Sequence, residues 1–265
     1  MKNFVLSNGV EAPNLAYGTW LIKNENAAEC VKLALKHGYR HIDTAQAYGN
    51  EEGVGKGIRE SGLDRKDIFV TTKVMAEFKS YKRAKKSIDE SLKRLGLDYV
   101  DLILIHCPQP WIIFRGPKTF DKENIQVWKA LEEAYKEGKV RSIGVSNFNV
   151  RELNNIINNC EIKPMVNQIC IHIGETPMDI IKFCQENGIV VEAYSPIAHG
   201  RALKNKDIAK MAEKYNVSIP QLCIQYTLQL DTISIPKASS EDHIKSNIDL
   251  NFEISKEDME ELIKQ

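Results

Sequence analysis

The sequence predicts one (β/α)8 barrel, a closed parallel sheet of eight strands with a helix after each strand. Short apolar, β-rich runs alternate with segments of helical periodicity from one end of the chain to the other. Eight such runs, each followed by a helical segment, favour a closed barrel over an open doubly wound sheet. The length of 265 residues suits one barrel, and no Pro/Gly/Ser-rich linker divides it, so residues 1–265 are expected to form a single domain.

The strands are expected in a regular order. Residues 4–6 and 10–12, around Ser7-Asn8-Gly9, predict a β-hairpin, because Asn-Gly is the strongest short turn signal. This hairpin should cap the bottom of the barrel. The eight barrel strands are predicted at residues 15–19, 40–43, 68–72, 100–106, 140–145, 165–168, 189–193 and 232–235.

Helical segments and loops separate these strands. Apolar residues recur at helical spacing between Ala84 and Leu95, before Gly96, and between Val127 and Tyr135, before Gly138. Residues 108–122 form the one long irregular connection. Because it follows the strand that ends at His106, it is expected to overhang the site as a lid or substrate wall.

The composition excludes several classes of partner. Lys+Arg and Asp+Glu both number 36, so the chain is neutral and does not attract nucleic acid. The N-terminus has no signal-peptide core and no apolar run is long enough to cross a membrane, so a cytoplasmic protein is expected. The six cysteines form no C-x-x-C pair, which favours reduced thiols, and no His/Cys/Asp cluster has metal-ligand spacing, so no metal site is expected.

One glycine-rich run superficially suggests a phosphate loop. Residues 53–57 read Gly-Val-Gly-Lys-Gly. A P-loop needs glycine where Asn50 stands and serine or threonine where Gly57 stands, so this interpretation is rejected.

Four polar side chains stand at or just after strand ends. Asp43, Lys73 and His106 each close an apolar run, and Tyr48 lies in the loop after Asp43. The carboxyl ends of barrel strands form the catalytic face of such folds. A lysine ammonium, kept charged by a carboxylate, should lower the pKa of a tyrosine and make it a general acid, while a histidine orients the same substrate oxygen. A carbonyl that accepts a hydride needs this chemistry. A structural Asp–Lys pair and a core histidine remain open as the alternative.

The later strands also end in polar or aromatic groups. Amide and hydroxyl side chains could hold a carboxamide, and a tyrosine face could stack on a flat heterocycle. Lys237, at the tip of the last strand, is expected to bind phosphate. The other residues of this set are Ser146, Asn147, Gln168, Tyr194 and Ser195.

Three ordered strings of residues resemble the motifs of one family. Residues 38–45 (Gly-Tyr-Arg-His-Ile-Asp-Thr-Ala) with 48–51 (Tyr-Gly-Asn-Glu) resemble its first motif. Residues 139–148 (Lys-Val-Arg-Ser-Ile-Gly-Val-Ser-Asn-Phe) resemble the second, and residues 235–237 (Ile-Pro-Lys) with Asn247 the third. From the hairpin to the last helix the chain resembles the aldo-keto reductases, of the bacterial type that includes 2,5-diketo-gluconate and glyoxal reductases.

The resemblance implies a (β/α)8 fold that binds extended NADP(H) without a Rossmann motif. It implies that Tyr48 is the proton donor, that Asp43 and Lys73 tune it, and that His106 orients the substrate. It further implies two groups of cofactor contacts. Those for the nicotinamide end are Ser146, Asn147, Gln168 and, stacked on the ring, Tyr194; those for the adenosine end are Lys237, Ser239 and Asn247.

The chain departs from the family pattern where the 2′-phosphate of NADP would bind. Ala238 replaces the usual Ser or Thr, and His243 replaces the usual Arg, which would offer a permanently charged fork. Lys237 and Ser239 could still grip the phosphate, so NADP(H) is favoured and NAD(H) is the alternative. The chain also lacks the long C-terminal loop of many relatives, which predicts an open pocket for small or varied substrates, with Trp20, Phe78 and Trp111 as aromatic walls.

The function expected from the sequence is NAD(P)H-dependent reduction of small carbonyl compounds, dicarbonyls or keto-sugars to alcohols. A monomer is expected, because a barrel of this kind completes its own site. Two alternatives remain: a cofactor-free barrel isomerase or lyase that uses Lys73 and Asp43, and a non-catalytic nicotinamide-binding regulatory protein.

Overall fold

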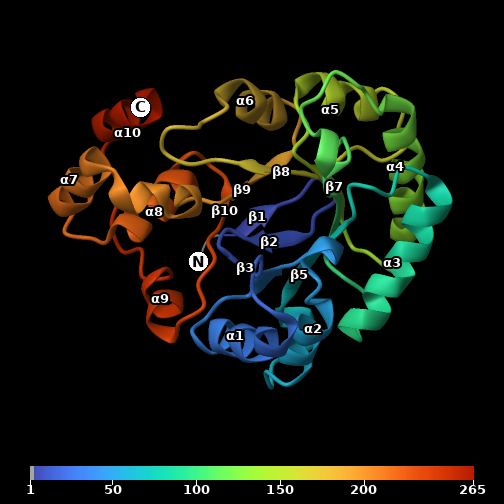
Figure 1. Ribbon diagram of the computed structural model, residues 1–265, viewed down its shortest axis with the longest axis horizontal. Helices are drawn as coiled ribbons and strands as arrows, with labels where there is room; N and C mark the ends of the chain where they lie inside the picture. The colour runs from blue at the N-terminus through green and yellow to red at the C-terminus, as the bar shows by residue number, and fades with distance from the viewer. Residues whose placement is uncertain (1–2) are drawn as a thin grey trace.

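The computed structural model describes residues 3–265 and shows a closed parallel barrel surrounded by helices (Figure 1). The hydrophobic core that strands and helices share is mostly aliphatic. The barrel strands are β3 (Ala16–Gly18), β4 (His41–Asp43), β5 (Phe69–Val74), β6 (Leu102–Ile105), β7 (Ile143–Ser146), β8 (Val166–Cys170), β9 (Val190–Tyr194) and β10 (Ile233–Ile235). They pair in sequence order, all in parallel. β10 returns to β3, because the Ser234 N–H donates to the Asn14 carbonyl at 2.9 Å and the Gly18 N–H to that of Pro236 at 2.9 Å. The predicted TIM-barrel fold is confirmed.

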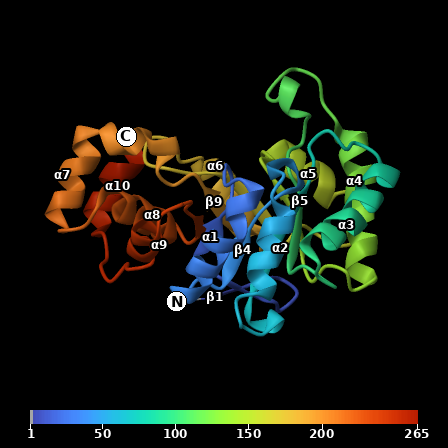
Figure 2. The ribbon, with the colours of Figure 1, turned by 60° about the horizontal axis from the view of Figure 1, so that its bottom comes forward.

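Helices surround the sheet (Figures 1 and 2). The α-helices are α1 (Asn24–Lys36), α2 (Glu51–Arg59), α3 (Tyr81–Leu95), α4 (Asp121–Lys136), α5 (Val150–Ile157), α6 (Met178–Glu186), α7 (Lys206–Lys214), α8 (Ile219–Gln229), α9 (Glu241–Ser246) and α10 (Lys256–Lys264). Short 3-10 turns are η1 (Gln46–Tyr48), η2 (Arg65–Asp67), η3 (Trp111–Ile113) and η4 (Ala198–Lys204). Among the described residues no helix is both long and apolar enough to cross a bilayer.

The N-terminal hairpin lies at the bottom of the barrel, as predicted. β1 (Asn3–Val5) and β2 (Glu11–Pro13) pair antiparallel. The Asn8 side chain donates to the Arg141 carbonyl at 2.8 Å, just before β7 begins, so the hairpin contacts the amino ends of the strands. The loop between β6 and α4 projects from the opposite end, above the carboxyl ends of the strands (Figure 2).

Glycines on α2 permit close helix packing. A Cβ on Gly53 would lie 2.3 Å from the Asn24 carbonyl oxygen, and one on Gly57 would lie 2.7 Å from that of Ala28, both on α1. A Cβ on Gly55 would lie 1.9 Å from the Leu95 carbonyl oxygen at the end of α3. The run that superficially suggested a phosphate loop is therefore a helix whose glycines let two neighbours approach.

Gly55→Ala should destabilise the protein by more than about 2 kcal/mol. The added Cβ would clash with backbone, and the cost of this clash is larger than the stability gained from alanine's higher helix propensity. The free energy of unfolding, measured by denaturant titration, tests this. Lys56→Ala on the same helix is the control, since its side chain is 61% exposed and its loss should cost under about 0.5 kcal/mol. Equal stability of the two variants would contradict the packing argument.

Candidate active site

A buried ion pair lies at the carboxyl ends of β4 and β5. The Lys73 Nζ atom lies 2.7 Å and 2.8 Å from the two carboxylate oxygens of Asp43 and donates to the Thr44 carbonyl at 2.9 Å. Both side chains are buried. The parallel pairing of β4 with β5 sets His41 opposite Phe69 and Asp43 opposite Thr71, which places the two strand ends side by side.

Tyr48 lies against this pair. The Tyr48 hydroxyl lies 3.3 Å from Lys73 Nζ. Tyr48 is the last residue of η1, and the next residue, Gly49, adopts the left-handed conformation that glycine favours. Asn50 fixes the loop: its side chain accepts from the Thr44 hydroxyl at 2.8 Å and donates to the Thr19 carbonyl at 2.9 Å. These hydrogen bonds fix the loop that carries Tyr48.

Burial decides the charge state of Tyr48. Burial is the largest single effect on Lys73 and acts to lower its pKa, but the charges and hydrogen bonds of Asp43 and Tyr48 together outweigh it, so the pKa lies above its usual value and the ammonium stays charged. Burial raises the pKa of Tyr48, and the Lys73 charge offsets only part of that rise. The ammonium does act to lower this pKa, as expected, but the net pKa lies above its ordinary value, because burial of the phenol is the larger effect.

His106 completes the group as a neutral imidazole. Its ring meets Tyr48 edge-on at 5.6 Å between centroids and Trp111 at 5.2 Å. Burial, followed by the Lys73 charge, lowers the pKa of His106 well below its usual value. A neutral ring carries one N–H, so His106 can donate a hydrogen bond without bringing a second positive charge beside the lysine.

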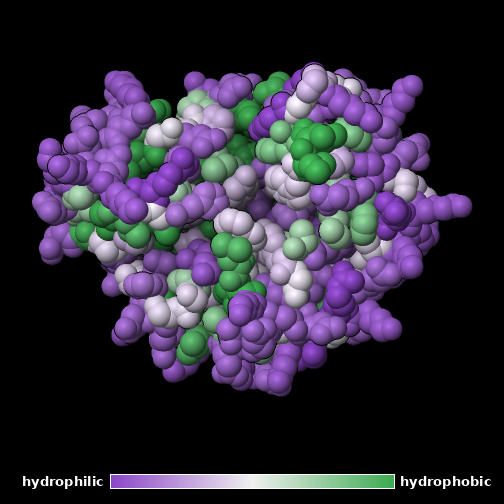
Figure 3. Space-filling model, in the orientation of Figure 1, coloured by the Kyte–Doolittle hydropathy of each residue, from purple (hydrophilic) through white to green (hydrophobic). Residues whose placement is uncertain are grey.

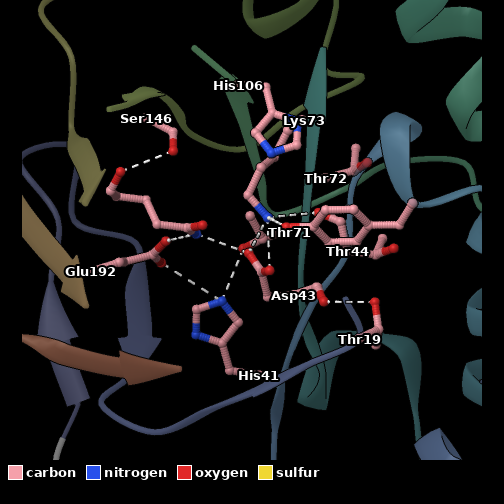
Figure 4. A network of polar contacts seen from close by, with 12 residues as sticks. Thr19, His41, Asp43, Thr44, Thr71, Thr72, Lys73, His106, Ser146 and Glu192 are labelled. Atoms are coloured by element: carbon pink, nitrogen blue, oxygen red, sulfur yellow. Dashed lines mark hydrogen bonds and ion pairs between the residues drawn. The ribbon is translucent and has the colours of Figure 1, made fainter. Parts of the chain in front are cut away.

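Beneath the four residues lies a polar network that the sequence analysis missed (Figure 4). Gln168 Nε2 donates to Asp43 at 2.9 Å and to Glu192 at 2.7 Å, which uses both of its amide hydrogens. His41 Nε2 lies 2.9 Å from the Thr71 hydroxyl and 3.8 Å from Glu192. A signal existed: His41 and Glu192 stand two residues before Asp43 and Tyr194, and alternate residues of a strand share a face.

The residues expected around a nicotinamide are linked to one another. The Ser146 hydroxyl donates to the Gln168 carbonyl at 2.9 Å, and Asn147 Nδ2 donates to the Ser146 hydroxyl and the His106 carbonyl, both at 3.0 Å. The Tyr194 hydroxyl donates to Asn147 Oδ1 at 2.8 Å. Asn147 and Ser195 both adopt positive φ, at 65° and 56°, which marks strained backbone just past two strand ends.

A separate cavity of about 470 Å³ lies beyond β10. Lys237 and Ser239 line it together with Lys23 and Glu29. Ala238 is buried, and its carbonyl accepts from the Tyr17 hydroxyl at 2.5 Å. His243 is exposed on α9, and Asn247, directly after that helix, is buried.

The three predicted aromatic walls differ in their surroundings. Trp111 contacts His106, and Trp20 meets His199 edge-on at 5.3 Å. Phe78 instead lines a cavity of about 410 Å³ that includes none of the four site residues, and it faces the Arg83 guanidinium at 5.8 Å. The geometry therefore gives no support to Phe78 as a substrate wall. Apolar side chains border the hollow at the centre of this face (Figure 3).

Residues 14–264 match the model of the Aldo/keto reductase family. The chain is 44% identical over 259 residues to the glyoxal reductase of Bacillus subtilis, covering 97% of this chain and 90% of that protein. A crystal structure of an aldo/keto reductase from Brucella melitensis superposes with a TM-score of 0.91 at 39% identity, covering 99% and 98% of the two chains. An aldo-keto reductase of Bombyx mori, solved in complex with NADP, gives a TM-score of 0.88 at 33% identity, covering 99% and 92%.

The chain belongs to the aldo/keto reductase family. It is an enzyme of the oxidoreductase class, and family membership sets aside the cofactor-free lyase and the non-catalytic binding protein.

The buried carboxyl of Glu192 predicts a pH-dependent loss of stability. Burial, and then the Asp43 charge, raises the pKa of Glu192 to about 8 in the folded protein. An unfolded glutamate loses its proton at much lower pH, so between these values unfolding releases a proton and rising pH favours the unfolded state. As the pH rises, this effect lowers the free energy of unfolding by at most about 1.4 kcal/mol per pH unit, until the carboxyl of the folded protein ionises.

Glu192→Gln should remove this pH-dependent contribution to stability. The contribution of His41, whose pKa burial lowers to about 4, should remain. The variant should therefore become more stable relative to the original protein as pH rises from 5 to 8, by roughly 1–4 kcal/mol in total. Denaturant unfolding at several pH values measures the difference. A difference that stays constant with pH would show that Glu192 is already ionised in the folded state.

Proposed function

We propose that this enzyme reduces an aldehyde or ketone to an alcohol with NADPH, and that Tyr48 donates the proton. The observation that carries the proposal is the chain of contacts from the half-buried Tyr48 to the buried Lys73 and Asp43, with a neutral His106 beside it. It presents the hydroxyl of Tyr48 and the neutral imidazole of His106 to the same space at the strand ends.

The residues present fit a nicotinamide cofactor. Because both Nε2 hydrogens of Gln168 are already donated, its amide oxygen is the atom left to accept from a carboxamide. Tyr194 offers a ring beside Asn147, and the cavity at Lys237 and Ser239 offers cationic and hydroxyl groups for a phosphate. When bound, the reduced cofactor supplies the hydride that the carbonyl carbon accepts.

The charge states of Tyr48, Lys73 and His106 determine how the proton is transferred. Burial keeps Tyr48 protonated near neutral pH, which is the form that a proton donor requires. The substrate oxygen, as it becomes negative, takes the hydroxyl proton of Tyr48. The phenolate left behind is stabilised by the Lys73 ammonium at 3.3 Å, and His106 donates a hydrogen bond that orients the oxygen.

Small carbonyl compounds, dicarbonyls or keto-sugars are the proposed substrates. The relative at 44% identity is named a glyoxal reductase, and glyoxal is a small dicarbonyl. Trp111 and Trp20 are the proposed aromatic walls, and Asn247 and Ser195 are proposed to contact the cofactor. A monomer suffices, since every group of the tetrad comes from this chain.

Tyr48→Phe should lower kcat for carbonyl reduction by about 10²- to 10⁴-fold, because the proton donor is lost while the ring remains. Cofactor binding, followed by fluorescence titration, should stay within about twofold, since no binding contact is removed. Tyr39→Phe, at a buried tyrosine outside the site, should retain activity. Full turnover of the Tyr48 variant would refute its role as the acid.

His243→Arg should improve kcat/KM for NADPH relative to NADH by about tenfold, because a guanidinium can bind a 2′-phosphate with two hydrogen bonds. Steady-state rates with both cofactors and one dicarbonyl substrate give the ratio. Lys245→Arg is the control, because it adds a guanidinium to the same helix at a different position. The placement of His243 at the phosphate would be contradicted by an equal gain in both variants.

A further inference from the structure

Three metal-binding side chains meet at the end of β8. The thiol of Cys170, a ring nitrogen of His172 and a carboxylate oxygen of Glu175 all lie within 4.8 Å of one another. A tetrahedral zinc ion holds such atoms about 3.3–3.8 Å apart, so a small side-chain adjustment would bring them onto one ion. The expectation that no cluster has metal-ligand spacing overlooked this Cys-x-His-x-x-Glu pattern.

The backbone, rather than chance contact, places two of these residues. The His172 N–H donates to the Glu175 carbonyl at 3.1 Å, and the Glu175 N–H donates back at 2.8 Å. Gly174, with φ at +93°, allows the tight turn between them. This reciprocal pairing holds the imidazole and the carboxylate on neighbouring positions of one small loop.

The imidazole is oriented as a metal ligand is. His172 Nδ1 lies 2.8 Å from the Ile173 carbonyl, which can only accept, so Nδ1 donates a hydrogen bond there and the ring is fixed. The other ring nitrogen, Nε2, faces the cluster and lies 3.2 Å from a Glu175 carboxylate oxygen. The exposed Arg201 guanidinium lies 3.3 Å from Nε2 and places a positive charge at this position.

We propose that Cys170, His172 and Glu175 form a binding site for a zinc-like divalent metal ion, with a fourth position open to water. The ligand set is one that zinc favours, and the exposed Glu175 side chain leaves a path for the ion to enter. Arg201 withdraws from Nε2 when the ion arrives. Zinc binds cysteine as the thiolate, so metal binding would release the proton of the Cys170 thiol.

The site would lie beside the catalytic face without including it. Cys170 is paired with Tyr194 in the register of β8 and β9, and the Tyr194 hydroxyl bonds Asn147. A bound ion would therefore tie the β8–α6 loop to the wall that carries Tyr194. The proposal concerns metal binding alone and stands independently of the proposed reduction.

The test is titration of the reduced, metal-free protein with Zn²⁺ by calorimetry and with Co²⁺ by absorbance. One ion per chain is expected, with a thiolate-to-cobalt charge-transfer band. Cys170→Ser should abolish the band, and both Cys170→Ser and Glu175→Gln should weaken zinc binding by more than about tenfold. Glu175 is exposed, so its variant tests the site without risk to the core. Arg201→Ala should strengthen binding severalfold, because a competing cation is removed.

Two matched controls should bind as the original protein does. Cys160→Ser removes a half-buried thiol outside the cluster, and His37→Gln breaks a second His–Glu pair, with Glu241 at 2.8 Å, that has no thiol beside it. Zinc affinity unaffected by both Cys170→Ser and Glu175→Gln, or a charge-transfer band that survives Cys170→Ser, would overturn the proposal.

Discussion

The buried ion pair between Lys73 and Asp43 is the constraint on which the site depends. Removing two charges from water costs several kcal/mol per ion, and the cost is offset only if geometry and further hydrogen bonds are good. Here the Thr44 carbonyl accepts from the ammonium and Gln168 donates to the carboxylate. Gln168 lies on β8 and Thr44 directly follows β4. Closure of the barrel brings these partners to the ion pair, and their hydrogen bonds offset the cost of burying it. The pair in turn provides the fixed positive charge beside Tyr48.

The polar interior extends further than catalysis by four residues would need. Glu192 and His41 lie at the centre of the barrel, where aliphatic side chains would pack more simply. Two atoms of this region, Glu192 Oε1 and His106 Nδ1, are buried and have no hydrogen-bond partner among residues 3–265. Such groups cost stability and cluster at functional sites, which agrees with the position of His106 at the catalytic end of the barrel and of Glu192 directly beneath the site.

The groups that stabilise the fold and the groups that form the site lie in different parts of the barrel. The hairpin closes the amino ends of the strands, and the glycines of α2 bring helices into contact on the outside. The carboxyl ends of the strands and the loops that follow them carry Tyr48, Trp111 and the Cys170–His172–Glu175 cluster. Loops there can vary without disturbing the packing below, which is why metal ligands can lie next to the catalytic group and remain distinct from it.

The sequence by itself determined the barrel, its strand order and the four residues of the tetrad. These follow from local information: each apolar run predicts a strand, and the residue that ends it must lie on the carboxyl face. Only the tertiary structure decided three further matters. The direction of the Tyr48 pKa shift depends on burial against the charge of Lys73, and both are set by other strands. Gln168 bonds Asp43 on β4 and Glu192 on β9, two strands that the sequence alone does not join to it. Phe78 faces Arg83, because side-chain direction in a loop depends on the neighbours that surround it and not on the spacing along the chain.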